Sequence, residues 1–251
     1  MTSSIPPKGN HRFNAEAASW DQNPTVHTAS ALALEAILSH IPALKSHSGT
    51  LDVLEIGCGT GILSFLIAPN VRSLTAVDTA QGMIDAFKIK LAAQPSIQNI
   101  LAIAADLVDP NDSCLFLDPV TKEQIKERRF DLIISHLVLH HIPSLQAILK
   151  TMYGCLKEGG CVALTDFEDF GPKARRFHPE SKMEGVQRHG IERGEMERLM
   201  RETGFVNVKV ETAFEMEKGV EKSPEAGVVK GEGGEKMVFP FLICLGRKDG
   251  S

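Results

Sequence analysis

A glycine-rich turn within residues 51–64, LDVLEIGCGTGILS, has the most informative spacing in this 251-residue chain. The turn consists of Glu55 at the end of an apolar run, followed by Gly57, Cys58, Gly59 and Gly61. Glycines at alternate positions let the backbone turn sharply and bring bare amides close to a ligand. The helix start that follows favours polar or anionic ligand atoms. A dinucleotide site needs Gly-x-Gly-x-x-Gly. Its third glycine would fall on Ile62, so the spacing argues against a nicotinamide cofactor.

Two further acids end apolar runs downstream of this turn. Asp78 lies 21 positions after Gly57, close to the separation of about 20 at which an acid meets ribose hydroxyls in doubly wound folds. Thr79 is expected to cap the following helix, which leaves the Asp78 carboxylate free for hydroxyl donors. Asp106 ends the next run, AIAAD, and could accept a hydrogen bond from an adenine amino group. Three acids at the carboxyl ends of successive strands predict a ligand crevice there.

In their order along the chain, these motifs resemble those of the class I S-adenosylmethionine-dependent methyltransferases. The matching segments are residues 51–61, 77–83, 104–107, FDLIISHLVLHHI at 130–142 and LKEGG at 156–160. The upstream FNAEAASWD, residues 13–21, is similar to the opening of the ubiquinone/menaquinone-type small-molecule enzymes. The resemblance extends over about residues 11–215 and the last strand.

The resemblance implies the cofactor S-adenosylmethionine and a set of residues that bind it. Glu55 would hold its amine, Asp78 its ribose hydroxyls, and Met83 would pack on adenine. The complete set implied for the cofactor is Glu55, Gly57, Cys58, Gly59, Gly61, Asp78, Thr79, Met83, Asp106, Leu107 and His136. Trp20 and Phe13 would form either an amino-terminal lid over the cofactor or a simple core anchor.

Methyl transfer needs an acceptor aligned behind the methyl group, and it needs a base only if the acceptor must lose a proton. The candidate bases are His189, then His178, and also His136 beside the crevice, because imidazole titrates near neutral pH. Residues 177–190 are expected to form the acceptor pocket and to contribute little to the cofactor pocket. His140 and His141 are expected to pack at a helix start. His178 and His189 could approach each other, but no metal site is predicted from this pair.

Alternating apolar runs and helical patterns must position these residues. They predict a doubly wound, Rossmann-like α/β fold with a seven-stranded mixed sheet whose last strand is antiparallel. The expected strands are residues 51–56, 73–77, 100–104, 130–135, 161–166, 206–215 and 237–245; the expected helices are 25–40, 61–68, 81–93, 145–156 and 194–202. Residues 1–24 are expected to be irregular, 25–251 to form one domain, 109–129 to be an insertion and 217–236 a flexible, charged loop.

The composition limits the classes of partner. A net charge of −5 gives no basic footprint for nucleic acid, and no run approaches the roughly 18 apolar residues of a membrane span. The amino-terminal residues do not read as a secretory signal or transit peptide. Five scattered cysteines without a Cys-x-x-Cys pair favour reduced thiols, hence the cytoplasm, with a nuclear share possible.

The predicted function is therefore methyl transfer from S-adenosylmethionine to an O, N or C atom of a small molecule. Two alternatives stay open: a protein acceptor, and a non-catalytic subunit that binds the cofactor within a complex. The intact glycines and acids argue against the second, because a subunit freed from catalysis need not retain them. Ser135-His136 at the end of the fourth strand argues against DNA or glutamine-amide acceptors, which need a proline-and-aromatic motif there.

Overall fold

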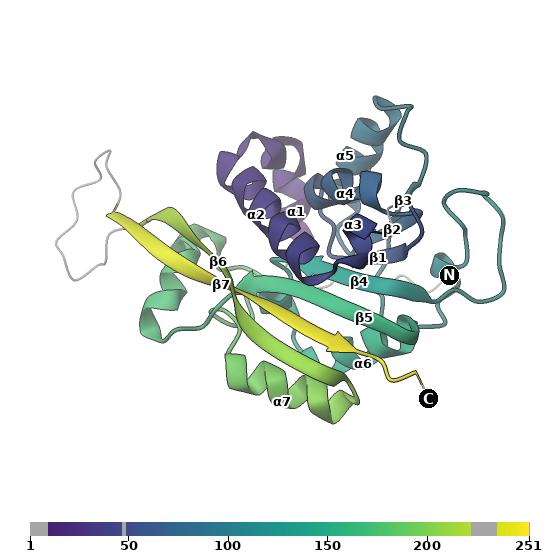
Figure 1. Cartoon of the computed structure of the whole chain (residues 1–251). Coiled ribbons are helices and arrows are strands. Elements are labelled where there is room, and N and C mark those ends of the chain that lie inside the picture. Colours follow the sequence, from purple (N-terminus) through teal and green to yellow (C-terminus); the bar gives the residue numbers. More distant parts are fainter. Residues whose placement is uncertain (1–9, 47–48, 222–234, 251) are drawn as a thin grey trace.

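The computed structural model describes residues 10–46, 49–221 and 235–250, and these form an α/β fold around one mixed sheet (Figure 1). The seven strands lie in the order β3-β2-β1-β4-β5-β7-β6. Their bounds are β1 Asp52–Ile56, β2 Ser73–Asp78, β3 Ile100–Ala104, β4 Phe130–His136, β5 Leu156–Phe167, β6 Val206–Val220 and β7 Glu235–Arg247. The strands β1 to β5 pair in parallel, whereas β7 runs antiparallel to both β5 and β6. The predicted fold class is confirmed.

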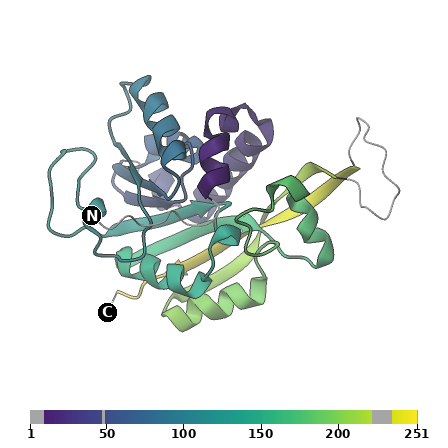
Figure 2. The ribbon, with the colours of Figure 1, turned by 180° about the vertical axis from the view of Figure 1, so that it is seen from behind.

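Helices cover both faces of the sheet, with α1 to α5 on one face and α6 and α7 on the other (Figures 1 and 2). Their bounds are α1 Asn10–Glu16, α2 Pro24–His40, α3 Ala43–Ser46, α4 Ile62–Ile67, α5 Gln81–Ala92, α6 Leu145–Cys155 and α7 Arg193–Thr203. Shorter 3-10 turns are Ala17–Gln22, Ala68–Asn70, Ser113–Leu115, Leu139–His141, Pro172–Phe177 and Glu180–Lys182. Each face has its own apolar core, in which Ile67 and Phe87 represent one face, and Leu149 and Met196 the other.

Local sequence signals set several of these boundaries. The Ser144 hydroxyl accepts the backbone N–H of Ala147 and caps the start of α6. The helix α7 ends at Gly204, whose φ of 110° is the left-handed conformation that glycine tolerates best. The parallel strands direct all their carboxyl ends to one edge of the sheet, where β1, β2 and β4 end beside one another. The glycine turn and the predicted acids therefore meet at this edge.

The expectation of an irregular segment over residues 1–24 is wrong from Asn10 onward, because α1 and a 3-10 turn occupy residues 10–22. Residues 1–9 lie outside the described residues. The Asn14 side chain accepts the backbone N–H of Gly82 at 2.7 Å, which fastens α1 to the start of α5. The rings of Phe13 and Trp20 meet edge to face with centroids 5.9 Å apart. The Asn14 bond and the packing of Phe13 and Trp20 against Met83 of α5 stabilise this segment, and its local composition does not reveal these contacts.

The expected flexible loop at 217–236 is wrong at both of its ends. Residues 217–220 belong to β6 and pair with residues 235–238 of β7, while residues 222–234 lie outside the described residues. Met216 and Val220 are buried against Phe239 in a third apolar cluster. Charged residues alternate with these buried ones, and Lys236 pairs with Glu217 across the hairpin at 2.6 Å. At the described ends of this range, the charged residues therefore lie on the exposed face of a hairpin.

The later part of the insertion at 109–129 packs beside the start of β2, at the opposite end of that strand from Asp78. Its Leu115 is fully buried. Its Asp118 pairs with Arg72 at 3.0 Å, and the buried Arg128 donates to the Ser73 hydroxyl at 2.7 Å. Among the described residues, no helix combines the length and the apolar character that a bilayer crossing requires.

Candidate functional site

The glycine turn connects β1 to α4 and is held against the neighbouring strand. The backbone N–H groups of Gly57 and Cys58 both donate to the Val77 carbonyl, at 2.8 and 3.1 Å. Gly57 has a φ of 74°, and an added Cβ would lie 2.2 Å from the Val138 side chain. Gly59 has a φ of 53°, but an added Cβ there would meet no atom within 4 Å. The turn is therefore packed from behind at Gly57 and open at Gly59, where a ligand can approach the backbone.

Asp78 lies at the carboxyl end of β2 and its carboxylate is bonded to the glycine turn. It accepts the backbone N–H of Gly59 at 2.8 Å and that of Ala80 at 2.8 Å. Burial raises the pKa of this carboxyl, and the backbone hydrogen bonds offset part of the rise. The expectation that Thr79 caps α5 is wrong, because the Thr79 hydroxyl donates to Asn10 of α1 at 3.0 Å. Asp78 itself accepts from the N-cap residue Ala80.

Glu55 is a buried carboxyl at the end of β1. Burial, with a smaller contribution from the charge of nearby Asp78, raises its pKa to about 8. The Ser64 hydroxyl of α4 donates to this carboxyl and partly offsets the effect of burial. Ser64 is not among the residues predicted from the sequence. Its only signal is its position in the first turn of the helix after the glycines, where a side chain can reach back to β1.

A cavity of about 990 Å³ lies at the carboxyl ends of β1, β2 and β4. Its walls include every residue predicted for the cofactor except Gly61. The acids on its walls are Glu55, Asp78 and Asp106. The cationic side chain on its walls is Lys150, so acids predominate. Gly61 instead faces the core, where an added Cβ would lie 2.5 Å from the buried Phe87 ring. The lack of a side chain at Gly61 leaves room for the Phe87 ring of α5 beside the start of α4.

His136 ends β4 on the wall of this cavity. Its Nδ1 is 2.9 Å from the Thr165 hydroxyl, while its buried Nε2 has no hydrogen-bond partner in the described part of the chain. Burial lowers the pKa of this imidazole to about 4. His136 is therefore neutral near pH 7 and has one ring nitrogen free to bond a ligand.

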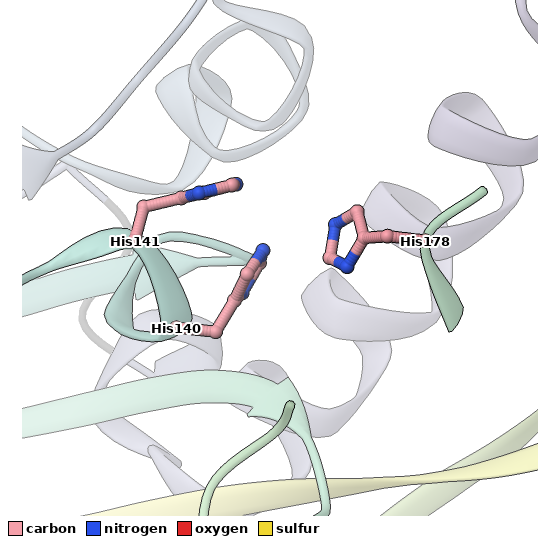
Figure 3. Close-up of side chains that lie close together, drawn as sticks. All are labelled: His140, His141 and His178. Carbon is pink, nitrogen blue, oxygen red and sulfur yellow. The ribbon is translucent and has the colours of Figure 1, made fainter. Parts of the chain in front are cut away.

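A second cavity of about 480 Å³ adjoins the first. The residues that line both cavities are Phe13, Trp20, Val26, Leu137 and His141. Three histidines, His140, His141 and His178, stand together on the wall of the smaller cavity (Figure 3). The smaller cavity also has an excess of cationic side chains, since Arg12, Arg176, Lys182 and Lys218 accompany Glu16 and Glu221.

The buried His140 follows the pattern expected for a packed histidine. Its Nδ1 is 2.8 Å from the carboxylate of Asp166, which is fully buried on β5. Asp166 also accepts the backbone N–H of His140 at 3.1 Å. Hydrogen bonds and charge from His140 lower the pKa of this carboxyl although burial opposes them. The prediction that His140 packs at a helix start is confirmed, and its partner is an ionised acid.

The sequence of this chain matches a known protein family. The family described as "Methyltransferase domain" matches residues 26–221. The chain belongs to this methyltransferase domain family. The resemblance inferred from the motifs is therefore confirmed at the level of the family. The match includes the glycine turn, both strand-end acids Asp78 and Asp106, and the histidines at the end of β4.

Two curated relatives and one solved structure illustrate the similarity of this methyltransferase domain. Malonyl-[acyl-carrier protein] O-methyltransferase of Priestia megaterium is 30% identical over 158 residues, 62% of this chain and 50% of the relative. Ubiquinone biosynthesis O-methyltransferase of Coxiella burnetii is 30% identical over 108 residues, 43% of this chain and 40% of the relative. The chain thus spans about half the length of the curated relatives that it matches. N-methyltransferase NodS of Bradyrhizobium japonicum, in complex with S-adenosyl-L-homocysteine, shares the fold with a TM-score of 0.56 at 17% identity, covering 95% of this chain and 96% of NodS.

The methyltransferase domain arranges the other predicted histidines differently from the expectation. His178 stands beside His140 and His141, with ring centroids 4.9 and 5.8 Å away. His189 lines neither of the two cavities, although its buried Nδ1 has no partner among the described residues. The expected approach of His178 to His189 is therefore replaced by contact of His178 with the histidines after β4.

The raised pKa of Glu55 predicts a pH-dependent stability of the ligand-free methyltransferase domain. The folded protein holds a proton that the unfolded chain, with a pKa of 4.5, releases. The contribution of Glu55 to the free energy of unfolding is fully present below pH 4.5 and is lost as the pH rises to about 8. We expect Glu55→Gln, which cannot ionise, to lose less stability than the wild type over this range in urea unfolding.

The exposed Glu35 of α2 provides the matched control, because Glu35→Gln removes a carboxyl without touching the cavity. The buried histidines make the free energy of unfolding change with pH in the opposite direction to Glu55 at lower pH. Their contributions cancel in the comparison, because the wild type and the variant both contain them. Equal slopes of unfolding free energy against pH for the wild type and Glu55→Gln would contradict a protonated Glu55.

Proposed function

We propose that this domain binds S-adenosylmethionine in the larger cavity and transfers its methyl group to a small molecule in the smaller cavity. The observation that carries the proposal is the wall of Phe13, Trp20, Val26, Leu137 and His141 that both cavities share. Because these residues border both cavities, a methyl group in one cavity and an acceptor in the other can approach each other directly where the cavities adjoin. Such alignment behind the methyl group is the main requirement of the transfer.

The walls of the larger cavity suit the charges and the shape of this cofactor. Glu55 would accept a hydrogen bond from its ammonium group, and Asp78 would accept hydrogen bonds from its ribose hydroxyls. Met83 and Leu107 present buried apolar surface for adenine. The exposed Asp106 lies on the wall of the same cavity and would accept a hydrogen bond from the adenine amino group. The cofactor supplies an electrophilic methyl group on a positively charged sulfur, and the positive charges of the cofactor would favour the ionised form of Glu55, which the ligand-free protein keeps protonated near pH 7. The open space at Gly59 leaves room beside the backbone.

The acceptor would occupy the smaller cavity. Residues Phe177, His178 and Lys182 line it, which supports a role of the segment 177–190 in acceptor binding. The same segment also places Gly185 and Gln187 on the larger cavity, so it is expected to touch the cofactor as well. This revises the expectation that the segment contributes little to the cofactor pocket.

A base is required only for an acceptor that still holds a proton. His136 on the larger cavity and His178 on the smaller one face the proposed ligands, whereas His189 does not line either cavity. We therefore favour His136 and His178 over His189 for this role. Burial, together with the nearby His140 and His141, lowers the pKa of His178 to about 2, so its ring is neutral near pH 7 but only weakly basic in the ligand-free protein.

The names of the relatives favour a small acceptor over a folded protein or a non-catalytic role. They include both O-methyltransferases and an N-methyltransferase, so the acceptor atom must be identified by experiment. We also propose a cytoplasmic location, with a nuclear share open, because all five cysteines are free thiols. Nucleic acid and membrane partners are not part of the proposal.

Binding of S-adenosylmethionine and its demethylated product to the purified chain, measured by calorimetry, tests the first half of the proposal. We expect both to bind, and absence of binding at millimolar concentration would reject the assignment. A metabolite extract incubated with isotopically methyl-labelled cofactor then tests the second half by mass spectrometry. Binding without a labelled product that depends on the protein would favour the non-catalytic alternative.

A further inference from the structure

The histidines of the smaller cavity form a compact cluster drawn from two distant parts of the chain. His140 and His141 end the 3-10 turn after β4, and His178 follows the turn Pro172–Phe177. One ring nitrogen from each lies within 4.8 Å of those of the other two. Figure 3 shows the three rings around a common space. The described residues contain no other group of three such side chains that could hold a metal ion.

The hydrogen bonds of two of these rings determine which nitrogen is free. The Nδ1 of His140 faces the Asp166 carboxylate, and the Nδ1 of His141 is 3.0 Å from the Gly185 carbonyl oxygen. Both oxygens can only accept, so each Nδ1 carries a proton, and in the neutral ring each Nε2 then keeps a lone pair. The Nε2 of His140 is buried without a hydrogen-bond partner among the described residues. His140 is 1% exposed, so this orphaned acceptor is inside the protein.

We propose that His140, His141 and His178 bind a divalent transition-metal ion such as Zn²⁺ through their ring nitrogens. A histidine that donates its other N–H to a carboxylate or a backbone carbonyl is the usual arrangement around a bound metal, because this bond orients the ring and makes it more basic. Asp166 and Gly185 supply these two bonds. Three histidines with an open fourth position are a known ligand set for zinc.

The distances require a small closure of the cluster. Nitrogens that share a tetrahedral zinc lie about 3.3 Å apart, given zinc–nitrogen distances of about 2.0–2.1 Å. The observed spread of up to 4.8 Å therefore requires a movement of about an ångström. His178 lies in the connection between β5 and α7, where a side-chain rotation can bring its ring inward. His140 is fixed by its contacts to Asp166 and can serve as the anchor.

The charges around the cluster indicate what would complete the coordination. The buried Asp166 supplies negative charge behind His140. Arg12 and Lys218, which line the same cavity, oppose a bare cation and favour an anionic fourth ligand.

Titration of the full chain with Zn²⁺ and with Co²⁺, after treatment with a chelator, tests this inference. We expect one ion to bind per chain, and bound Co²⁺ to show visible bands of nitrogen coordination without a thiolate charge-transfer band. His178→Ala is expected to weaken binding at least about tenfold, and His178→Gln to behave in the same way. Asp166→Asn keeps the shape of the supporting residue but removes its charge, and should weaken binding about 10–100-fold.

His189→Ala is the matched control, since His189 lies in the same connecting segment outside the cluster, and it should bind metal like the wild type. Melting temperatures identify any variant that fails to fold, in which case His141→Ala replaces it. No binding at millimolar metal, equal binding by His178→Ala, or a thiolate band from the cysteines would each overturn the inference. Calorimetry with S-adenosylmethionine on the same samples is independent, so failure of the metal site and failure of the cofactor site are distinguishable.

Discussion

Replacing Asp78 with alanine is expected to weaken binding of S-adenosylmethionine by about 1–3 kcal/mol, which corresponds to roughly 5–150-fold in the dissociation constant. The variant removes the carboxylate that would accept the ribose hydroxyls. It also frees the backbone N–H groups of Gly59 and Ala80, which the carboxylate now holds at 2.8 Å. Buried donors without an acceptor cost free energy. Calorimetry with the cofactor and its demethylated product measures the effect.

Two variants separate the role of this carboxylate from a general loss of charge. Asp78→Asn keeps one acceptor oxygen and should bind with intermediate affinity. Asp85→Ala removes an exposed acid on α5 that bonds only Gln81 and should bind like the wild type. An unchanged dissociation constant for folded Asp78→Ala would remove Asp78 from the binding site.

Replacing Gly61 with alanine is expected to lower the free energy of unfolding by about 2–5 kcal/mol. Gly61 has a φ of 86°, which is unfavourable for a residue with a Cβ. The new Cβ would also lie 2.5 Å from the ring of Phe87, which is fully buried and held by the core. Overpacking and backbone strain act together at this position. Urea unfolding of the ligand-free protein measures the loss.

Gly49 provides a matched control for the backbone term. Its φ of 82° is close to that of Gly61, but an added Cβ there meets no atom within 4 Å. Gly49→Ala should therefore lose only about 1–2 kcal/mol. Combining Gly61→Ala with Phe87→Leu should recover part of the packing loss. If Gly61→Ala and Gly49→Ala lowered the free energy of unfolding by the same amount, steric contact with Phe87 would not explain the loss at Gly61.

The sequence by itself determined the fold class and brought together most residues of the proposed cofactor site. Both follow from contacts that are local or repeated along the chain. Apolar runs alternating with helical patterns specify a parallel sheet, and the carboxyl ends of parallel strands must share one edge. Glu55, Asp78 and Asp106 each end such a run, so their convergence on one cavity could be predicted without coordinates.

The exceptions at the cofactor site arise from contacts across the fold. Thr79 bonds Asn10 of α1, a segment expected to be irregular. Gly61 turns toward Phe87, and Ser64 reaches back to Glu55. In each case the partner lies in another element, and the sequence pattern records that a side chain is polar or absent but does not record what it faces.

Only the tertiary structure decided the arrangement of the histidines. His178 lies 38 positions after His140 along the chain, in a connection without a strong periodic pattern. Its place depends on how that connection folds over the end of β5, and therefore on the packing of Phe177 against Phe167 and Phe239. The partner of His140, Asp166, likewise comes from the neighbouring strand. When side chains meet because irregular segments pack together, no characteristic spacing in the sequence predicts the contact. The distance between them depends on which other residues are buried.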